Sequence, residues 1–166
     1  LTALDISDVA LERCRHRCNK FTHINFLQHD ISTGAPDGSY ELIVCSEILY
    51  YLKDQDALKN FARKITCALQ DGGHILITHS NMVTDDRLHT GFDFNEIGAL
   101  YIGHVFSEIA ELEFIRELRT ELYRVQLFGK STPADRTLTE CGFACSPREV
   151  ICREHAPFEH PSIKWG

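Results

Sequence analysis

Short apolar segments alternate with helical segments along the first half of the chain, and this alternation constrains the fold more than any other feature. Four predicted strands span Thr2–Leu4, Ile24–Asp30, Tyr40–Ser46 and His74–Ser80, and two predicted helices span Asp8–Asn19 and Asp54–Leu69. The turn Asp71–Gly73 is expected to close the second helix. This order indicates an α/β protein with a mostly parallel sheet and helices on both faces. The nearly continuous apolar run Leu42–Cys45 fits a strand that is covered on both faces.

The second half of the chain continues with a loop, a helix and two strands. The segment Asn81–Phe94 is polar and irregular, and its length is typical of a functional lid or substrate loop. A helix is expected at about Ile97–Ile109. Strands at Leu112–Leu118 and Leu122–Phe128 are joined by a short connection, which predicts an antiparallel hairpin. We expect one domain over residues 1–130 and an irregular tail over residues 131–166, where periodicity is weak.

Composition and charge narrow the class of protein. The 166 residues suffice for one domain with a core, and the net charge of −7 argues against nucleic acid or an anionic membrane as main partners. No apolar run approaches the ~18 residues of a membrane span, and no signal peptide begins the sequence. The seven cysteines lack the paired spacing of a zinc site, which indicates reduced thiols in a cytoplasmic protein and no bound metal. The first residue is Leu, which favours a true start upstream of this sequence.

Acidic residues close the first two predicted strands. In open parallel sheets ligands bind at the carboxyl ends of the strands, where Asp5 and Asp30 both lie. A carboxylate at such a position can accept hydrogen bonds from ribose hydroxyls, and it normally follows a glycine-rich loop by about 20 residues. The alternative is that Asp5 starts a turn and Asp30 caps a helix or loop. Two acids at consecutive strand ends favour a nucleoside site.

Several segments together resemble a known family. "LTALDIS" with "ALERCRHR", "FLQHDIS", "YELIVCSEILYYL" and "LQDGGHILITHS" are similar, in this order, to class I S-adenosylmethionine-dependent methyltransferases. "SEILYYL", "GFDF" and "TELYRVQLFGK" most resemble the nodulation protein S-like branch, and the likeness covers Leu1–Lys130. The resemblance implies a Rossmann-like fold and the cofactor S-adenosyl-L-methionine. It also implies methyl transfer to a small molecule. The reaction implied is N-methylation of an amino sugar or of a deacetylated chitooligosaccharide. The family's first strand and glycine-rich loop are absent, so we expect this sequence to be truncated at its N-terminus.

The resemblance also implies roles for individual residues around the cofactor. Asp5 would hold the ribose hydroxyls and Asp30 would accept a hydrogen bond from the adenine amino group. Ile6 and Ile31 would pack on the adenine ring. Cys45 and Ser46, at the end of the third strand of this sequence, would line the cofactor through their backbone.

The acceptor is expected to meet the methyl donor at residues 47–51. Glu47 is the first candidate to orient or deprotonate the acceptor, with helix capping or a surface charge as the alternative. Adjacent Tyr50 and Tyr51 are not expected to share a face, so one could line the pocket while the other packs in the core. His79 is a second catalytic candidate, beside a purely structural role. Three further polar residues are candidates for substrate contacts, with solvated loop positions as the alternative for the last two: Asn81, His89 and Asp93.

Two other functions compete with methyl transfer. A nicotinamide-dependent oxidoreductase also uses an acid after its second strand, but the sequence contains no catalytic Tyr-x-x-x-Lys pair. A protein without the glycine-rich loop could instead be an inactive scaffold or interaction module. The sequence leaves the oligomeric state open.

Overall fold

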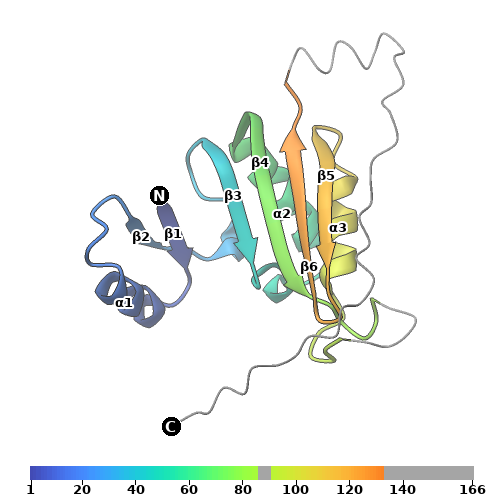
Figure 1. Cartoon of the computed structure of the whole chain (residues 1–166), viewed down its shortest axis with the longest axis horizontal. Helices are drawn as coiled ribbons and strands as arrows, with labels where there is room; N and C mark the ends of the chain where they lie inside the picture. Colours follow the sequence, from blue (N-terminus) through green and yellow to red (C-terminus); the bar gives the residue numbers. More distant parts are fainter. Residues whose placement is uncertain (86–90, 133–166) are drawn as a thin grey trace.

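The computed structural model describes residues 1–85 and 91–132 (Figure 1). Its strands form two sheets. The first pairs β1 (Thr2–Asp5) with β2 (Asn25–Gln28), and the second has the order β3-β4-β6-β5, with β3 at Tyr40–Ser46, β4 at Leu69–Ser80, β6 at Tyr123–Lys130 and β5 at Leu112–Arg119. The three α-helices of the described residues are α1 (Asp8–Arg17), α2 (Gln55–Ala68) and α3 (Ala99–Ser107).

The chain opens with a β-α-β unit. β1 and β2 are parallel, with Asp5 opposite Gln28. Helix α1 begins where the Ser7 hydroxyl accepts a hydrogen bond from the Ala10 amide at 3.2 Å, which satisfies one free donor of the first turn. Asp8 at its start and basic residues in its last turn suit the helix dipole. The predicted unit is confirmed.

The second sheet combines parallel and antiparallel pairing. β3 and β4 are parallel, β4 and β6 are antiparallel, and β5 and β6 form the predicted antiparallel hairpin. Helices α2 and α3 lie behind this sheet in Figure 1. Their apolar side chains bury Ile75 and Ile77 of β4 and Phe128 of β6, which are at most 1% exposed. The α/β fold class is confirmed.

The outer face of β3 is less covered than its sequence predicts. Leu42 and Val44 are 57% and 53% exposed, whereas Cys45 is buried. The expectation of cover on both faces is wrong for the described residues because α2 and α3 pack on one face only. Within the described part, β3 also pairs with a strand along one edge alone, that of β4.

The predicted turn at Asp71–Gly73 is absorbed into a strand. β4 begins at Leu69, directly after α2, and the pairing with β3 jumps from Leu69 opposite Tyr40 to His74 opposite Leu42. The extra residues of β4 form a bulge. Gly72 in this bulge has a φ of +76°, a backbone conformation that is strained for a residue with a side chain. The turn is therefore a bulge inside β4 rather than a separate connection.

No helix in the described ranges is long and apolar enough to cross a membrane.

Candidate functional site

The candidate site lies where the parallel strands end. β1, β3 and β4 point the same way in Figure 1, so their carboxyl ends share one edge of the molecule. The connection after β3 runs through a short 3-10 helix, η2 (Leu49–Tyr51), and the segment 91–98 returns to the same edge. This edge carries most of the predicted site residues.

Glu47 stands at the centre of this edge. It follows β3 with a φ of +54°, and its amide donates to the Thr78 carbonyl at 3.0 Å. Its Oε2 accepts hydrogen bonds from the Tyr50 hydroxyl and the Ser80 hydroxyl, both at 2.7 Å. Its Oε1 is buried and has no hydrogen-bond partner within the described residues. A buried carboxylate oxygen without a partner is costly, which points to a donor supplied by a ligand.

His79 is buried beside Glu47, with 1% of its surface exposed. Its Nε2 accepts hydrogen bonds from the amides of Ile48 at 3.3 Å and Leu49 at 3.1 Å, so the ring is neutral with its proton on Nδ1. Burial lowers its pKa from 6.5 to about 4, although the nearby Glu47 carboxylate opposes the shift. The nitrogen that would take a proton is already used, which favours the structural role over the catalytic one.

Tyr50 and Tyr51 diverge from η2. Tyr50 is 4% exposed, and its pKa is raised by burial first and by its bond to Glu47 second. Tyr51 is 74% exposed, and its ring lies edge-on to that of Tyr50 with centroids 4.8 Å apart. The two adjacent rings therefore do not share a face.

Asn81 is buried and fully engaged by the protein. Its Nδ2 donates to the carbonyls of Thr120 at 3.0 Å and Glu121 at 3.1 Å, and its Oδ1 accepts from Arg124 Nε at 3.2 Å. Arg124 also donates to both oxygens of Glu117. These bonds fix the β5–β6 turn against the end of β4, and they leave Asn81 no spare amide hydrogen for a substrate.

The two acids of the first unit take part in local turns. Asp5 is exposed, and its Oδ1 accepts from the Ser7 amide at 2.8 Å. Asp30 caps the 3-10 helix η1 (Ile31–Thr33) by accepting from the Ser32 amide at 2.8 Å, and this bond lowers the pKa of Asp30. Asp5 has a second oxygen that the turn does not use. Both alternative roles, turn and cap, are thus present and compatible with ligand binding.

The apolar candidates beside these acids differ in exposure. Ile6 is 62% exposed, whereas Ile31 is half-buried against the core. Cys45 points into the core, where burial raises its pKa to about 12, so only its backbone can face a ligand. Ser46 is exposed at the last pair of β3 with β4.

The returning segment is tied to the site by hydrogen bonds to backbone carbonyls. The Phe92 amide donates to the Asn81 carbonyl at 2.8 Å, and Asn95 Nδ2 donates to the Tyr50 carbonyl at 2.8 Å. Gly91 has a φ of +132°, and a side chain there would collide with the Asn81 backbone. Asp93 is exposed on this segment, and His89 lies outside the described residues.

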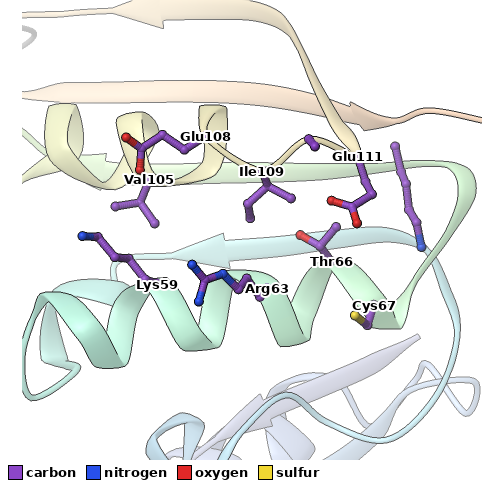
Figure 2. Close-up of a pocket in the computed structure, with 10 residues that line it drawn as sticks. Lys59, Arg63, Thr66, Cys67, Val105, Glu108, Ile109 and Glu111 are labelled. Carbon is purple, nitrogen blue, oxygen red and sulfur yellow. The ribbon is translucent and has the colours of Figure 1, made fainter. Parts of the chain in front are cut away.

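A cleft of about 440 Å³ lies elsewhere, between α2 and α3 (Figure 2). Lys59, Arg63 and Lys130 line it together with Glu108 and Glu111, so its charges are mixed. It includes none of the predicted site residues. It also lies toward the start of β4, because Lys130 Nζ donates to the Leu69 carbonyl at 2.6 Å. It is therefore separate from the carboxyl-end site.

Sequence reasoning did not identify Ser80, Arg124 or Glu117 as part of this site. Ser80 is the last residue of a predicted strand, where a serine is common, and its partner Glu47 is 33 residues away. The position of Ser80 at the carboxyl end of β4 was the one available signal.

The parallel strands with acids at their carboxyl ends and the antiparallel hairpin at the far edge define the class I S-adenosylmethionine-dependent methyltransferase fold. Similar solved structures agree. The N-methyltransferase NodS from Bradyrhizobium japonicum WM9, in complex with S-adenosyl-l-homocysteine, matches with a TM-score of 0.67 and 22% identity over 80% of this chain and 67% of that chain. An S-adenosylmethionine-dependent methyltransferase from Clostridium acetobutylicum ATCC 824 matches with a TM-score of 0.62 and 12% identity over 79% of this chain and 75% of that chain.

Residues 1–138 match the Nodulation protein S (NodS) family, and the chain belongs to it. Nodulation protein S of Rhizobium tropici is 27% identical over 135 residues, which is 81% of this chain and 51% of that protein. The Bradyrhizobium diazoefficiens (strain JCM 10833 / BCRC 13528 / IAM 13628 / NBRC 14792 / USDA 110) protein is 41% identical over 54 residues, 32% of this chain and 26% of that protein. The chain spans about half the length of the first curated relatives it matches.

Proposed function

We propose that this protein transfers a methyl group from S-adenosyl-L-methionine to the amine of a small molecule, an amino sugar or a deacetylated chitooligosaccharide. Membership of the NodS family and the likeness to an N-methyltransferase NodS support the activity. The single observation that carries the acceptor's chemistry is Glu47 Oε1, a buried carboxylate oxygen without a partner in the described part of the chain. An amine offers it the donor that it lacks.

The residues of the first unit fit the nucleoside part of the cofactor. Asp5 keeps one carboxylate oxygen for a ribose hydroxyl, and exposed Ile6 offers an apolar surface to the adenine. Asp30 and Ile31 follow β2. Asp30 would accept a hydrogen bond from the adenine amino group, and Ile31 would pack on the adenine ring. Cys45 and Ser46 would contribute backbone contacts from the end of β3. The bound sulfonium supplies an electrophilic methyl group, which forms a bond to nitrogen as the C–S bond breaks with its electron pair on sulfur.

Glu47 would act on the acceptor nitrogen. Its Oε1 accepts a hydrogen bond from the N–H, which aims the nitrogen lone pair at the methyl carbon, and it takes up the proton that the alkylated nitrogen releases. Proximity and orientation of donor and acceptor together can contribute roughly 7–11 kcal/mol, and this hydrogen bond is one part of that. The left-handed backbone of Glu47 matches the strain often found at functional residues.

N-methylation suits the site better than O-methylation. A hydroxyl usually needs a strong base before it attacks, whereas a neutral amine does not. Of the two candidate bases at this edge, His79 cannot serve because its Nε2 is engaged by two backbone amides, and a carboxylate such as Glu47 is a weak base for a hydroxyl. We therefore assign positioning roles to His79 and Asn81. Tyr51 and Asp93, both exposed at this edge, would contact the acceptor, as would His89.

The first test is calorimetric titration of S-adenosylhomocysteine into this chain and into a version extended upstream of Leu1. Binding by the extended version, followed by transfer of labelled methyl to glucosamine and not to N-acetylglucosamine, would support the proposal. Binding by neither would favour the inactive scaffold. Binding without transfer to any amine would refute the acceptor assignment.

Glu47→Gln provides the sharper test of the acceptor site. The glutamine side chain keeps the shape of the glutamate side chain but lacks its negative charge, so kcat should fall about 10²–10⁴-fold. The affinity for S-adenosylhomocysteine should stay within about twofold. Glu41→Gln, at an exposed position on the strand that leads to Glu47, is the matched control and should leave kcat unchanged. Equal rates for Glu47→Gln and the wild type would contradict the role of Glu47.

A further inference from the structure

Five aromatic rings from three parts of the chain form a connected group beside Glu47, which we call the aromatic row. The rings of Tyr50 and Tyr51 are 4.8 Å apart, and those of Tyr50 and Phe94 are 5.3 Å apart. Phe94 lies 5.9 Å from Phe92, and Phe92 lies 6.3 Å from Tyr123. The row therefore joins η2, the returning segment and the start of β6.

Most of this row is not core. Tyr51, Phe94 and Tyr123 are 74%, 54% and 40% exposed, although all three rings touch another aromatic ring. Exposed aromatic side chains that cluster rather than scatter mark a contact surface. Glu47 lies beside the second ring of the row, because the Tyr50 hydroxyl donates to Glu47 Oε2 at 2.7 Å.

The row is also held in place before any ligand arrives. Asn95 Nδ2 fixes the Tyr50 carbonyl, and the Phe92 amide is bonded to the Asn81 carbonyl. The Val83 amide donates to the Phe92 carbonyl at 2.8 Å, so Phe92 is bonded on both sides. A surface that is ordered in advance loses less entropy on binding.

We propose that the aromatic row is the acceptor platform, on which sugar rings stack while the terminal amine reaches Glu47. This inference rests on the proposed function. The C–H faces of a pyranose are apolar and pack on aromatic rings, and its hydroxyls stay in water. From Tyr50 beside the carboxylate, the rings of Phe94, Phe92 and Tyr123 lead away in succession, which fits a ligand with one terminal amine followed by repeated amphipathic rings. The row therefore selects an oligosaccharide over a single amino sugar.

The experiment measures equilibrium binding to the extended protein, without methyl donor, of free glucosamine and of a chitin tetramer deacetylated only at its terminal sugar (the tetramer). Phe94→Ala and Tyr51→Ala should each raise the Kd of the tetramer about three- to tenfold, in line with the energy of one aromatic contact. The Kd of glucosamine should change less than about twofold, because its amine contact with Glu47 remains. Leu100→Ala, 41% exposed and outside the row, is the matched control and should bind the tetramer as the wild type does.

The outcomes separate this inference from the proposed function. Weaker tetramer binding by the row variants, with no methyl transfer by any version, would support the row and refute the activity. Methyl transfer with an unchanged tetramer Kd in both row variants would refute the row and leave the activity standing. Failure of the wild type to bind the tetramer, or binding no tighter than that of glucosamine, would also overturn the platform. Unchanged affinity for S-adenosylhomocysteine in the variants would verify that they are folded.

Discussion

Acid should destabilise this protein through His79. The pKa of this histidine is about 4 in the folded state and 6.5 ordinarily, so the unfolded state binds the proton more readily. The stability that comes from its neutral form is present above about pH 6.5 and is lost as the pH falls toward 4. With these two values, linkage gives a loss of about 2 kcal/mol in the free energy of unfolding between pH 7 and pH 5.

The assay is urea unfolding at several pH values for the wild type and His79→Gln. Gln has a carbonyl oxygen that can accept from the amides of Ile48 and Leu49, but it does not titrate. The difference in stability between the two proteins should shift by about 2 kcal/mol in favour of the variant between pH 7 and pH 5. His74→Gln, at an exposed position on the same strand, keeps His79 and should retain the wild-type loss.

A difference that stays constant with pH would refute the reasoning. It would mean that the folded protein accepts the proton on His79 as easily as the unfolded chain does. The bonds from the two amides to Nε2 would then not hold in solution.

Two further predictions concern other parts of the chain. Gly103→Ala should lower the free energy of unfolding by about 1–3 kcal/mol, measured by urea unfolding, because the added methyl would collide with the buried Gln126 amide; a stability equal to the wild type would show that Gln126 can move aside. Asp5→Ala in the extended protein should weaken S-adenosylhomocysteine binding about tenfold or more in calorimetry, because a ribose hydroxyl would lose a charged partner; unchanged affinity would remove Asp5 from the cofactor site.

The elements were predictable where the signal was local. The bounds of β3 match the prediction, and α2 lies within one residue of it at both ends. In α2, the Asp54 side chain accepts from the Ala57 amide at 2.8 Å, and apolar residues repeat at helical spacing, so the sequence marks both the start and the buried face.

The errors arose where the result depends on distant parts of the chain. Leu42 and Val44 have the residue types of a strand buried on both faces, but their exposure depends on which elements cover them. The bulge at Gly72 depends likewise on how β4 pairs with β3. The sequence of a strand alone therefore determines neither its register nor the elements that cover it.

The candidate site shows the same limit. The position of Glu47 at the carboxyl edge was predictable because it directly follows a strand. The bonds that define its chemistry come from Ser80, 33 residues away, and from Tyr50. The hydrogen bonds between Asn81 and the β5–β6 turn could not be predicted either, because its partners lie 39 or more residues further along the chain.

The conformation of Glu47 is imposed by its neighbours rather than chosen by the residue. A left-handed backbone costs a non-glycine residue about 1–2 kcal/mol, whereas each hydrogen bond returns about 1 kcal/mol. The amide of Glu47 is bonded to Thr78, and its Oε2 is bonded to two hydroxyls, which together outweigh the strain. Thr78, His79 and Ser80 are consecutive residues of β4, and His79 holds the next backbone amides in place. The end of one buried strand therefore sets the direction of Glu47, and it leaves Oε1 without a hydrogen-bond partner among the described residues.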